Sequence, residues 1–193
     1  HKALIPPLTK VSDFIVKHYK IAIVVFLVLL GPAIYGNSNY KIYYNIDQGL
    51  PKNIPSAEAN DKLKEHFNMS NVHMVLLKDG LSAKDKNQMI KKIEKVDGVK
   101  WVIGLNSLVG PNFPETMIPE DVKSMLKTDK YELQFVCSDY SSATDKVNAQ
   151  LDEMQKIVKG YQKDAMVIGE APLMKDLQDT TDIDLKTVNY ISI

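Results

Sequence analysis

The segment VHMVLLKDG, from Val72 to Gly80, sets the architecture of the chain around it. Its apolar run is almost continuous as far as Lys78, and Asp79-Gly80 is a dipeptide typical of turns. A short apolar run that ends in a turn is typical of a strand in the middle of a sheet. We therefore predict a central strand followed directly by a turn.

A helix and another strand are predicted after this turn. Ser82 and Asp85 make a helix-capping pattern, and an apolar stripe at helical spacing follows and ends at Asp97-Gly98. The stripe consists of Met89, Ile90, Ile93 and Val96. A strand is then predicted over residues 99–105, with alternate side chains on one face, namely Val99, Trp101, Ile103 and Leu105.

A second copy of the pattern begins at Tyr131. This strand alternates between two sets, Tyr131, Leu133, Phe135 and Cys137 against Glu132, Gln134, Val136 and Ser138, which predicts one buried face, with Cys137 on it, and one wetter face. Ser142 and Asp145 repeat the capping pattern, and a helical stripe follows, formed by Val147, Leu151, Met154, Val158 and Tyr161. Gly160 closes the helix, and residues 165–168 supply a last short strand. The order βαββαβ predicts an α+β, ferredoxin-like fold with two helices on one face of four strands.

Further segments lie outside that unit. We predict a strand over residues 40–46 and an amphipathic helix over residues 56–67, which aligns Ala59, Leu63 and Phe67. Residues 106–119 form a loop rich in glycine and proline with several apolar side chains, including Ile118. An apolar loop of that length usually packs against its own core or a partner. The candidate substrate or partner surface therefore consists of Leu108, Val109, Phe113, Met117, Met154 and Met166.

The N-terminal part of the chain contains a long apolar segment. Residues 21–35 carry no charge and, as a helix, would span about 22 Å, short of the roughly 30 Å hydrocarbon layer. Extension back to Phe14 gives a transmembrane helix over residues 14–36, in which Lys17 and Lys20 can reach the headgroups. The excess of lysine before this segment predicts a cytoplasmic N-terminus, residues 1–13. A cleaved signal peptide and a buried soluble helix are the alternatives.

Composition and motifs exclude several classes of function. All 24 basic residues are lysine, without any arginine, and they are balanced by 24 acidic residues, so we expect no nucleic-acid partner. The single cysteine, Cys137, excludes an internal disulfide and an all-cysteine metal site. No catalytic, phosphate-binding or dinucleotide-binding motif is present, so we predict no enzyme activity, no cofactor and no metal. The aspartates of the last predicted helix are interpreted as a solvated face, namely Asp176, Asp179, Asp182 and Asp184.

Several strings of this sequence resemble a known superfamily. The most specific are DQGLP, Asp47 to Pro51, after the first span, and GEAPL, Gly169 to Leu173, before renewed hydrophobicity. Together with HMVLLKDG and GVKWVIGLNSLVGPNFPE, they resemble the resistance-nodulation-division (RND) exporters. Within that superfamily the chain is similar to the mycobacterial membrane protein large (MMPL) branch as found in Gram-positive bacteria. The resemblance covers essentially the whole chain.

The resemblance implies a proton-driven membrane transporter that exports lipids or other hydrophobic compounds. Residues 37–180 would then form its first extracytoplasmic porter domain, and residues 181–193 would lead into a second transmembrane span. The implied partners are the lipid bilayer, a hydrophobic substrate, and the remaining helices and second porter loop of the same polypeptide, which would continue past Ile193. The resemblance also allows a homo-oligomer, and it places the proton-relay residues elsewhere. The alternative is a single-span anchored module that binds other proteins of a membrane complex.

Overall fold

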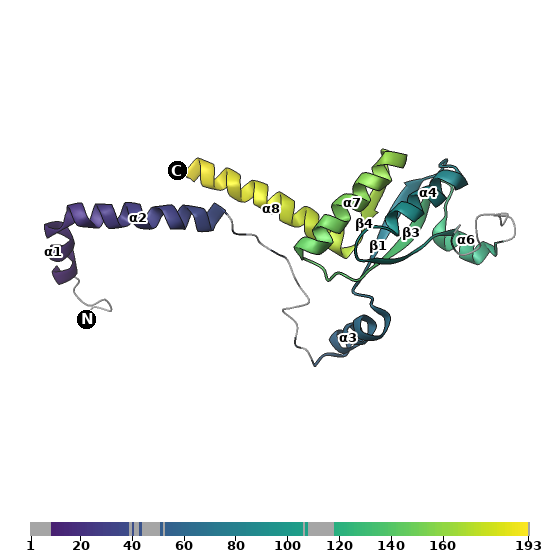
Figure 1. Cartoon of the computed structure of the whole chain (residues 1–193), viewed down its shortest axis with the longest axis horizontal. Coiled ribbons are helices and arrows are strands. Elements are labelled where there is room, and N and C mark those ends of the chain that lie inside the picture. The colour runs from purple at the N-terminus through teal and green to yellow at the C-terminus, as the bar shows by residue number, and fades with distance from the viewer. Residues whose placement is uncertain are drawn as a thin grey trace, which may run out of the picture. The chain divides into compact units, whose positions relative to one another are not determined.

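The computed structural model describes residues 9–38, 40, 43, 51, 53–105, 107 and 118–192. Within them the chain forms seven helices and a four-stranded antiparallel sheet (Figure 1). It divides into two compact units, residues 1–41 and 42–193, which are described separately below. The predicted strand over residues 40–46 and most of the predicted loop over residues 106–119 lie outside the described residues.

The N-terminal unit consists of two helices separated by a turn at His18. They are α1, Thr9–Lys17, and α2, Tyr19–Ser38. The helix predicted to begin at Phe14 therefore begins at Tyr19, and Phe14 lies in α1. Among the described residues, Tyr19–Asn37 is the one stretch of helix long and apolar enough to cross a membrane. A membrane anchor and a signal sequence both have this length and composition.

The second unit is built on a sheet whose strands lie in the order β2-β3-β1-β4. Its strands are β1, Asn71–Lys78; β2, Val99–Ile103; β3, Tyr131–Ser138; and β4, Met166–Ile168. In β1, Val75 pairs with Gln134 of β3 on one side and with Val167 of β4 on the other. The predicted central strand is thus confirmed, and all neighbouring strands are antiparallel.

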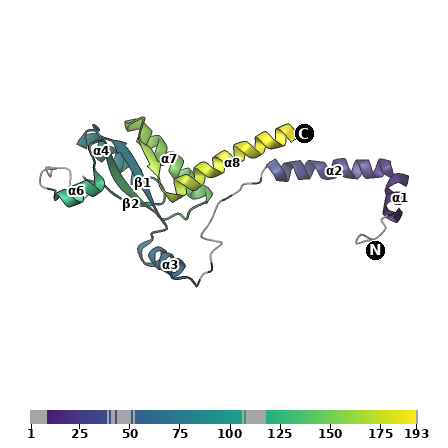
Figure 2. The same ribbon diagram turned by 180° about the vertical axis from the view of Figure 1, so that it is seen from behind.

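Two helices cover one face of this sheet, as the two opposite views show (Figures 1 and 2). They are α4, Ala83–Ile93, and α7, Asp145–Tyr161. Their apolar stripes close a core with the side chains of the strands beneath them. The buried members of this core are Val75, Leu77, Met89, Ile90, Ile93, Val96, Val102, Val136, Met154, Val158 and Ala165.

Both covering helices begin at side-chain caps. Ser82 accepts a hydrogen bond of 3.1 Å from the backbone N–H of Asp85, as the capping pattern predicts. The cap of α7 is Thr144, whose hydroxyl accepts from the backbone N–H of Val147 at 3.3 Å, so the prediction of Ser142 was wrong. The Ser142 hydroxyl instead donates to Asn71 at 2.9 Å and ties the loop before α7 to β1.

The polar set of β3 is more deeply buried than the sequence predicts, while Cys137 is buried as predicted. Glu132, Gln134, Val136 and Ser138 lie under the helices and are at most 1% exposed, whereas Tyr131 on the other face is 40% exposed. Glu132 and Ser138 can be buried because α4 and α7 bring polar partners, Lys86 and Gln150, into the interior. Alternation in the sequence therefore separates the two faces correctly but does not predict the burial of the polar set.

The predicted face of β2 changes for a different reason. The pairing with β3 shifts between Val99 and Trp101, which is the signature of a bulge. Val99 and Val102 both contact the helix-covered core, while Trp101 and Ile103 pair with Cys137 and Phe135 on the other face. The prediction that Val99 and Trp101 share a face was therefore wrong.

Three more helices belong to this unit. They are α3, Pro55–Phe67; α6, Glu120–Leu126; and α8, Glu170–Ser192. No residue of α3 is buried. Leu126 of α6 joins Leu105 and Ile118 in a small cluster against Phe135. The helix α8 runs without a break across the predicted boundary at residue 181, and only its N-terminal half contains buried residues.

Candidate functional site

The face of the sheet opposite α4 and α7 is apolar across its width; we call it the open face. Pairing register arranges its side chains in rows: Trp101, Cys137 and Val72; then Ile103, Phe135, Met74 and Ile168; then Leu133, Leu76 and Met166. The pair of Tyr131 and Lys78 closes one end of these rows. Side chains on neighbouring strands that lie opposite each other are close enough to form a continuous surface.

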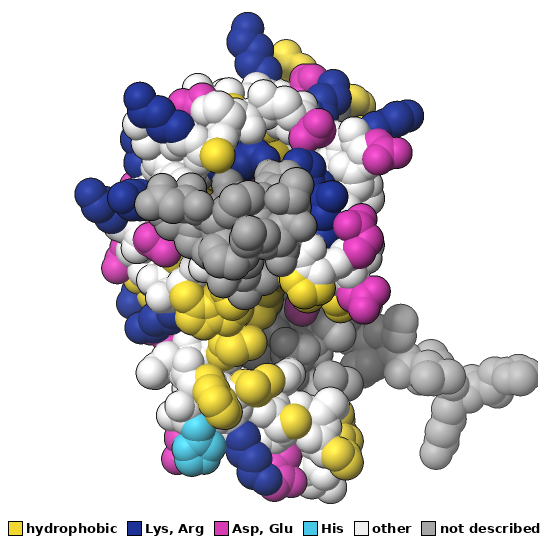
Figure 3. All heavy atoms as spheres, turned by 90° about the vertical axis from the view of Figure 1, so that its right-hand side faces the viewer, with side chains coloured by type: hydrophobic (Ala, Val, Ile, Leu, Met, Phe, Trp, Pro, Cys, Tyr) yellow, Lys and Arg dark blue, Asp and Glu magenta, His cyan; other side chains and the backbone are white. Residues whose placement is uncertain are grey.

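No helix in the described part of the chain packs across the open face. Leu105, Ile118 and Leu126 pack against Phe135 in the second row and cover that part of the face. Most of the other side chains are half-buried by their neighbours in the rows, and Met166 on the edge strand is 47% exposed. Figure 3 shows hydrophobic side chains gathered together on the face of the molecule that it presents. Exposed apolar patches of this kind mark interaction sites or ligand-binding surfaces.

Trp101 and Cys137 lie opposite each other in the first row, and each is the only residue of its type in the chain. Cys137 is fully buried between its larger neighbours. Burial raises the pKa of its thiol, and the nearby Asp139 adds to the effect, which keeps the sulfur protonated and unreactive at neutral pH. The pair thus contributes apolar surface and no chemistry.

The covered face of the sheet contains a buried ion pair. Lys86 of α4 donates to Glu132 of β3, and the two side chains are 5% and 1% exposed. The second carboxylate oxygen of Glu132 and both amide atoms of the neighbouring Gln134 lack hydrogen-bond partners. This cluster explains how a charged residue of β3 can lie under α4. Both charged side chains are almost fully buried beneath α4.

A second polar group joins the N-terminal end of β1 to α7. The Gln150 carbonyl oxygen accepts from Ser138 at 2.7 Å and lies 3.2 Å from His73 Nε2, while its amide nitrogen donates to the backbone carbonyl of Asp97 at 2.7 Å. His73 is fully buried, and Nδ1 of its ring has no partner. Burial lowers the pKa of His73, and the hydrogen bond with Gln150 opposes this only in part. The imidazole is therefore neutral and serves to hold the sheet against α7.

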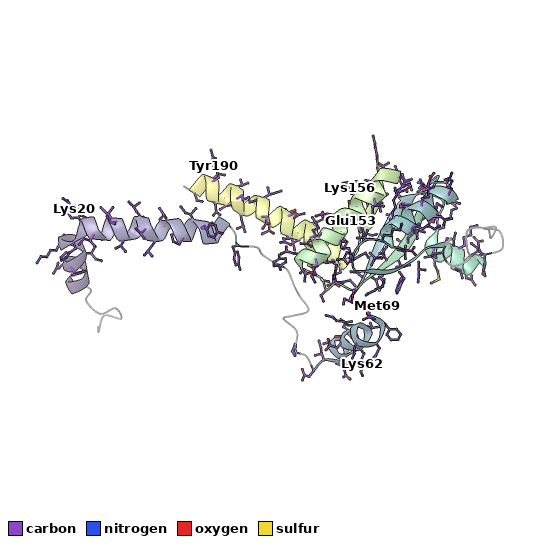
Figure 4. The ribbon with its side chains drawn as sticks, in the orientation of Figure 1. Lys20, Lys62, Met69, Glu153, Lys156 and Tyr190 are labelled. Atoms are coloured by element: carbon purple, nitrogen blue, oxygen red, sulfur yellow. The ribbon has the colours of Figure 1, made fainter. Side chains whose placement is uncertain are left out.

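The outer surface of the two covering helices carries a shallow groove of about 600 Å³. Its lining residues are Gln88, Lys92, Glu153, Lys156, Ile157, Gly160 and Tyr161. Glu153 and Lys156, labelled in Figure 4, extend from α7 into solvent. Lys92 Nζ lies 4.8 Å from the centre of the Tyr161 ring, so these two side chains already form a cation–π interaction. We regard this groove as ordinary helix surface and the open face as the candidate site.

The structure describes two of the six predicted surface residues. Leu108, Val109, Phe113 and Met117 lie outside the described residues. Met154 is fully buried in the core between α7 and the sheet, where it presents no surface to a ligand. Met166 belongs to the open face.

Sequence reasoning missed the central members of the open face, Met74, Phe135 and Trp101. A signal for them is present in β1, because its apolar residues occupy both alternating positions, Val72, Met74 and Leu76 as well as Val75 and Leu77. A strand with two apolar faces requires a cover on each side. The two helices that the βαββαβ order predicts cover one face of the strand and leave the other face without a predicted cover.

No protein-family model matches the chain, and no curated protein matches it. Within the described residues there is also no group of three or more histidine, cysteine, aspartate or glutamate side chains arranged to hold a metal ion. The open face is therefore the feature on which an account of function can be built.

Proposed function

We propose that this chain forms the first porter domain of a proton-driven exporter of lipids or other hydrophobic compounds. In this proposal it belongs to the MMPL-like branch of the RND superfamily. One observation carries the proposal: the sheet presents a continuous apolar face, in a chain that also contains a segment with the length and composition of a membrane span.

The arrangement of the sheet unit supports a ferredoxin-like porter domain. Three features of this unit are those expected of a split βαββαβ motif. They are the chain order β1-α4-β2-β3-α7-β4, the spatial order β2-β3-β1-β4, and the position of α4 and α7 on one face. The helix α6 is an insertion between β2 and β3 in this description. A fold of this kind hosts many functions, so the argument for transport rests on the open face.

The proposed topology follows from the charges around α2. Lys10, Lys17 and Lys20 outnumber Asp13 near its N-terminal end, which places that end in the cytoplasm by the positive-inside rule. The sheet unit is then extracytoplasmic. The remaining membrane helices, the second porter loop and the proton relay belong, in this proposal, to other parts of the same polypeptide.

The chemistry of the open face suits an acyl chain or another substrate without polar groups. Each methylene group removed from water contributes about 0.8 kcal/mol, without any directional contact. Met74 and Met166 provide flexible, polarizable side chains that can adapt to substrates of different shape. Such a surface selects for hydrophobicity more than for a particular structure.

Binding at the open face can be measured through Trp101. We would reconstitute the full chain in lipid nanodiscs and titrate it with 1-anilinonaphthalene-8-sulfonate, following energy transfer from this single tryptophan. We expect saturable transfer, weakened several-fold by Met166→Glu on the open face. Met125→Glu is the matched control, because Met125 is a 77% exposed methionine of α6 outside that face. Absence of saturable transfer, or equal effects of the two substitutions, would reject the open face as a binding surface.

The size of the native polypeptide tests the assignment to an exporter. We would measure its intact mass in the source membranes, where the proposal expects several times the 21.7 kDa of this chain. A native mass near 21.7 kDa would contradict an exporter and would favour the single-span binding module.

A further inference from the structure

We propose that α3 folds back onto the open face of the sheet and covers it while no ligand is bound. The argument that α3 docks is independent of the proposed function. The competition between α3 and a hydrophobic ligand rests on the proposed function. Both surfaces are uncovered in the described part of the chain, and a short link, Asn68–Ser70, joins them.

The apolar stripe of α3 requires a partner. Ala59, Leu63 and Phe67 lie at successive i, i+4 positions and therefore share one face of the helix. Leu63 is 39% exposed and Phe67 is 67% exposed. The opposite side carries Asp61 and Glu65, which favour water. A helix of this composition buries its apolar side against another element.

The link between α3 and β1 is hydrogen-bonded at both ends and contains a hinge. Asn68 closes α3 with a left-handed φ of 51°, and the backbone N–H of Met69 donates to the carbonyl of Leu63 at 3.3 Å. The backbone N–H of Ser70 already donates to the carbonyl of Ser138 at 2.9 Å, as part of the sheet. The bonds between Met69 and Ser70 are therefore where α3 can rotate relative to β1, at the position labelled in Figure 4.

The dimensions allow the helix to reach the sheet. The link Asn68–Ser70 can span no more than about 10 Å, so the C-terminal end of α3 stays within about one layer separation of the start of β1. The 13 residues of α3 give a helix about 20 Å long, comparable to the length of β1 beneath it. A helix that reverses direction before a central strand can pack on either face of the sheet. Because α4 and α7 occupy one face, the open face is the one available to α3.

The stripe of α3 and the open face are both mainly apolar, so the two surfaces suit each other. Facing the stripe of α3, the three rows of the open face present apolar side chains, and Lys78 lies with Tyr131 at the end of the face. Lys64 at the edge of α3 already donates to Ser141 at 3.3 Å, a contact at the rim of the sheet. The result is a three-layer arrangement, with α3 on one side of the sheet and α4 and α7 on the other.

Trp101 reports on this docking directly. We would measure quenching of its fluorescence by acrylamide for the full chain in nanodiscs without ligand. The test variant is Leu63→Gln/Phe67→Gln, and the control is Asp61→Gln/Glu65→Gln, which introduces the same residue on the opposite side of the same helix. Docking predicts at least a two-fold rise in the quenching constant of the test variant and no change in the control. Equal quenching in the test variant and the unaltered chain would overturn the docking of α3.

A reciprocal variant keeps the test valid if the glutamine substitutions disturb folding. In Trp101→Phe/Phe67→Trp the only indole is on α3, and docking predicts that acrylamide quenches it less than free tryptophan by a factor of about three or more. Quenching equal to that of free tryptophan would overturn the proposal.

A titration with 1-anilinonaphthalene-8-sulfonate separates docking from binding. Competition predicts that Leu63→Gln/Phe67→Gln binds the dye several-fold more tightly than the unaltered chain does. Dye binding without any change in Trp101 quenching would overturn docking and leave the proposed function intact. Trp101 protection by α3 without dye binding to either protein would support docking and overturn the proposed binding surface.

Discussion

Lys86 and Glu132 form a charged pair in the interior of the sheet unit, and their side chains are almost fully buried. Removal of one member of a buried pair leaves an uncompensated charge, which usually costs about 3–5 kcal/mol. We expect Lys86→Met to lower the free energy of unfolding by about this amount, as measured by urea unfolding followed through Trp101 fluorescence. The double variant Lys86→Met/Glu132→Leu is expected to recover most of the loss, since it leaves no charge behind. A single variant as stable as the unaltered protein would show that the pair is open to water.

His73 makes the stability of the sheet unit depend on pH. Burial lowers the pKa of its imidazole below the ordinary value of 6.5, so the unfolded chain binds a proton more readily than the folded one. Stability is therefore fully present above pH 6.5 and falls as the pH decreases below it, by at most about 1.4 kcal/mol per pH unit. Urea unfolding at several pH values, above the range near 4 where carboxylates titrate, measures this slope.

The matched variants for this slope are His73→Gln and His66→Gln. We expect the first to flatten the pH dependence below 6.5. The second is the matched control, a histidine on the exposed surface of α3. If stability fell with decreasing pH equally steeply in both variants, the proton would be taken up by a group other than His73.

At the scale of single elements, the start of α4 depends on Ser82. Its hydroxyl oxygen accepts the backbone N–H of Asp85 and also donates to the Asp85 carboxylate at 2.6 Å. Loss of such a cap costs about 1 kcal/mol, so Ser82→Ala should lower the free energy of unfolding by that amount. Lys84→Ala in the same turn is the control and should change stability by less than about 0.5 kcal/mol. If both substitutions lowered the free energy of unfolding equally, loss of the cap would not be the cause.

The elements of the sheet unit could be predicted from sequence because their signals are local. The turn at Asp79-Gly80, the cap at Ser82 and the stripe that contains Met89 depend on neighbouring residues alone, and the structure confirms each of them. The covered face of β3 could not be predicted in this way. Its buried Glu132 and Ser138 depend on Lys86 and Gln150, which lie far away in the chain.

Of the predicted surface residues that the structure describes, Met166 lies on the open face and Met154 does not. The prediction depended on an apolar loop and on individual methionines, of which Met154 fills the core. The open face depends on pairing register, which brings Trp101 and Cys137 opposite each other and places Phe135 beside Met74. Register is a property of several strands together, and the bulge in β2 shifts it further.

At the scale of the whole molecule, α2 and the open face are apolar surfaces of different kinds. The described side chains of α2 are exposed nearly all round the helix, with Leu27 at 59% and Leu30 at 38%. The open face is apolar on one side of a structured sheet whose other side is covered. A helix without a polar side is stable in a bilayer, where lipid surrounds it, whereas a one-sided surface requires a ligand or another protein element.

This difference predicts how the chain behaves in membranes. We expect the full chain to remain in the membrane pellet after an alkaline carbonate wash, and Leu27→Asp/Leu30→Asp to release it. Each aspartate near the centre of a spanning helix costs about 2.5–3.5 kcal/mol, so the pair shifts the membrane partition by a factor of about 1,000 or more. Val122→Asp/Met125→Asp, on exposed positions of α6, is the control and should stay in the pellet. Release of the unaltered chain would contradict a membrane anchor, and a mature protein that lacks α2 by intact mass would identify that helix as a cleaved signal sequence.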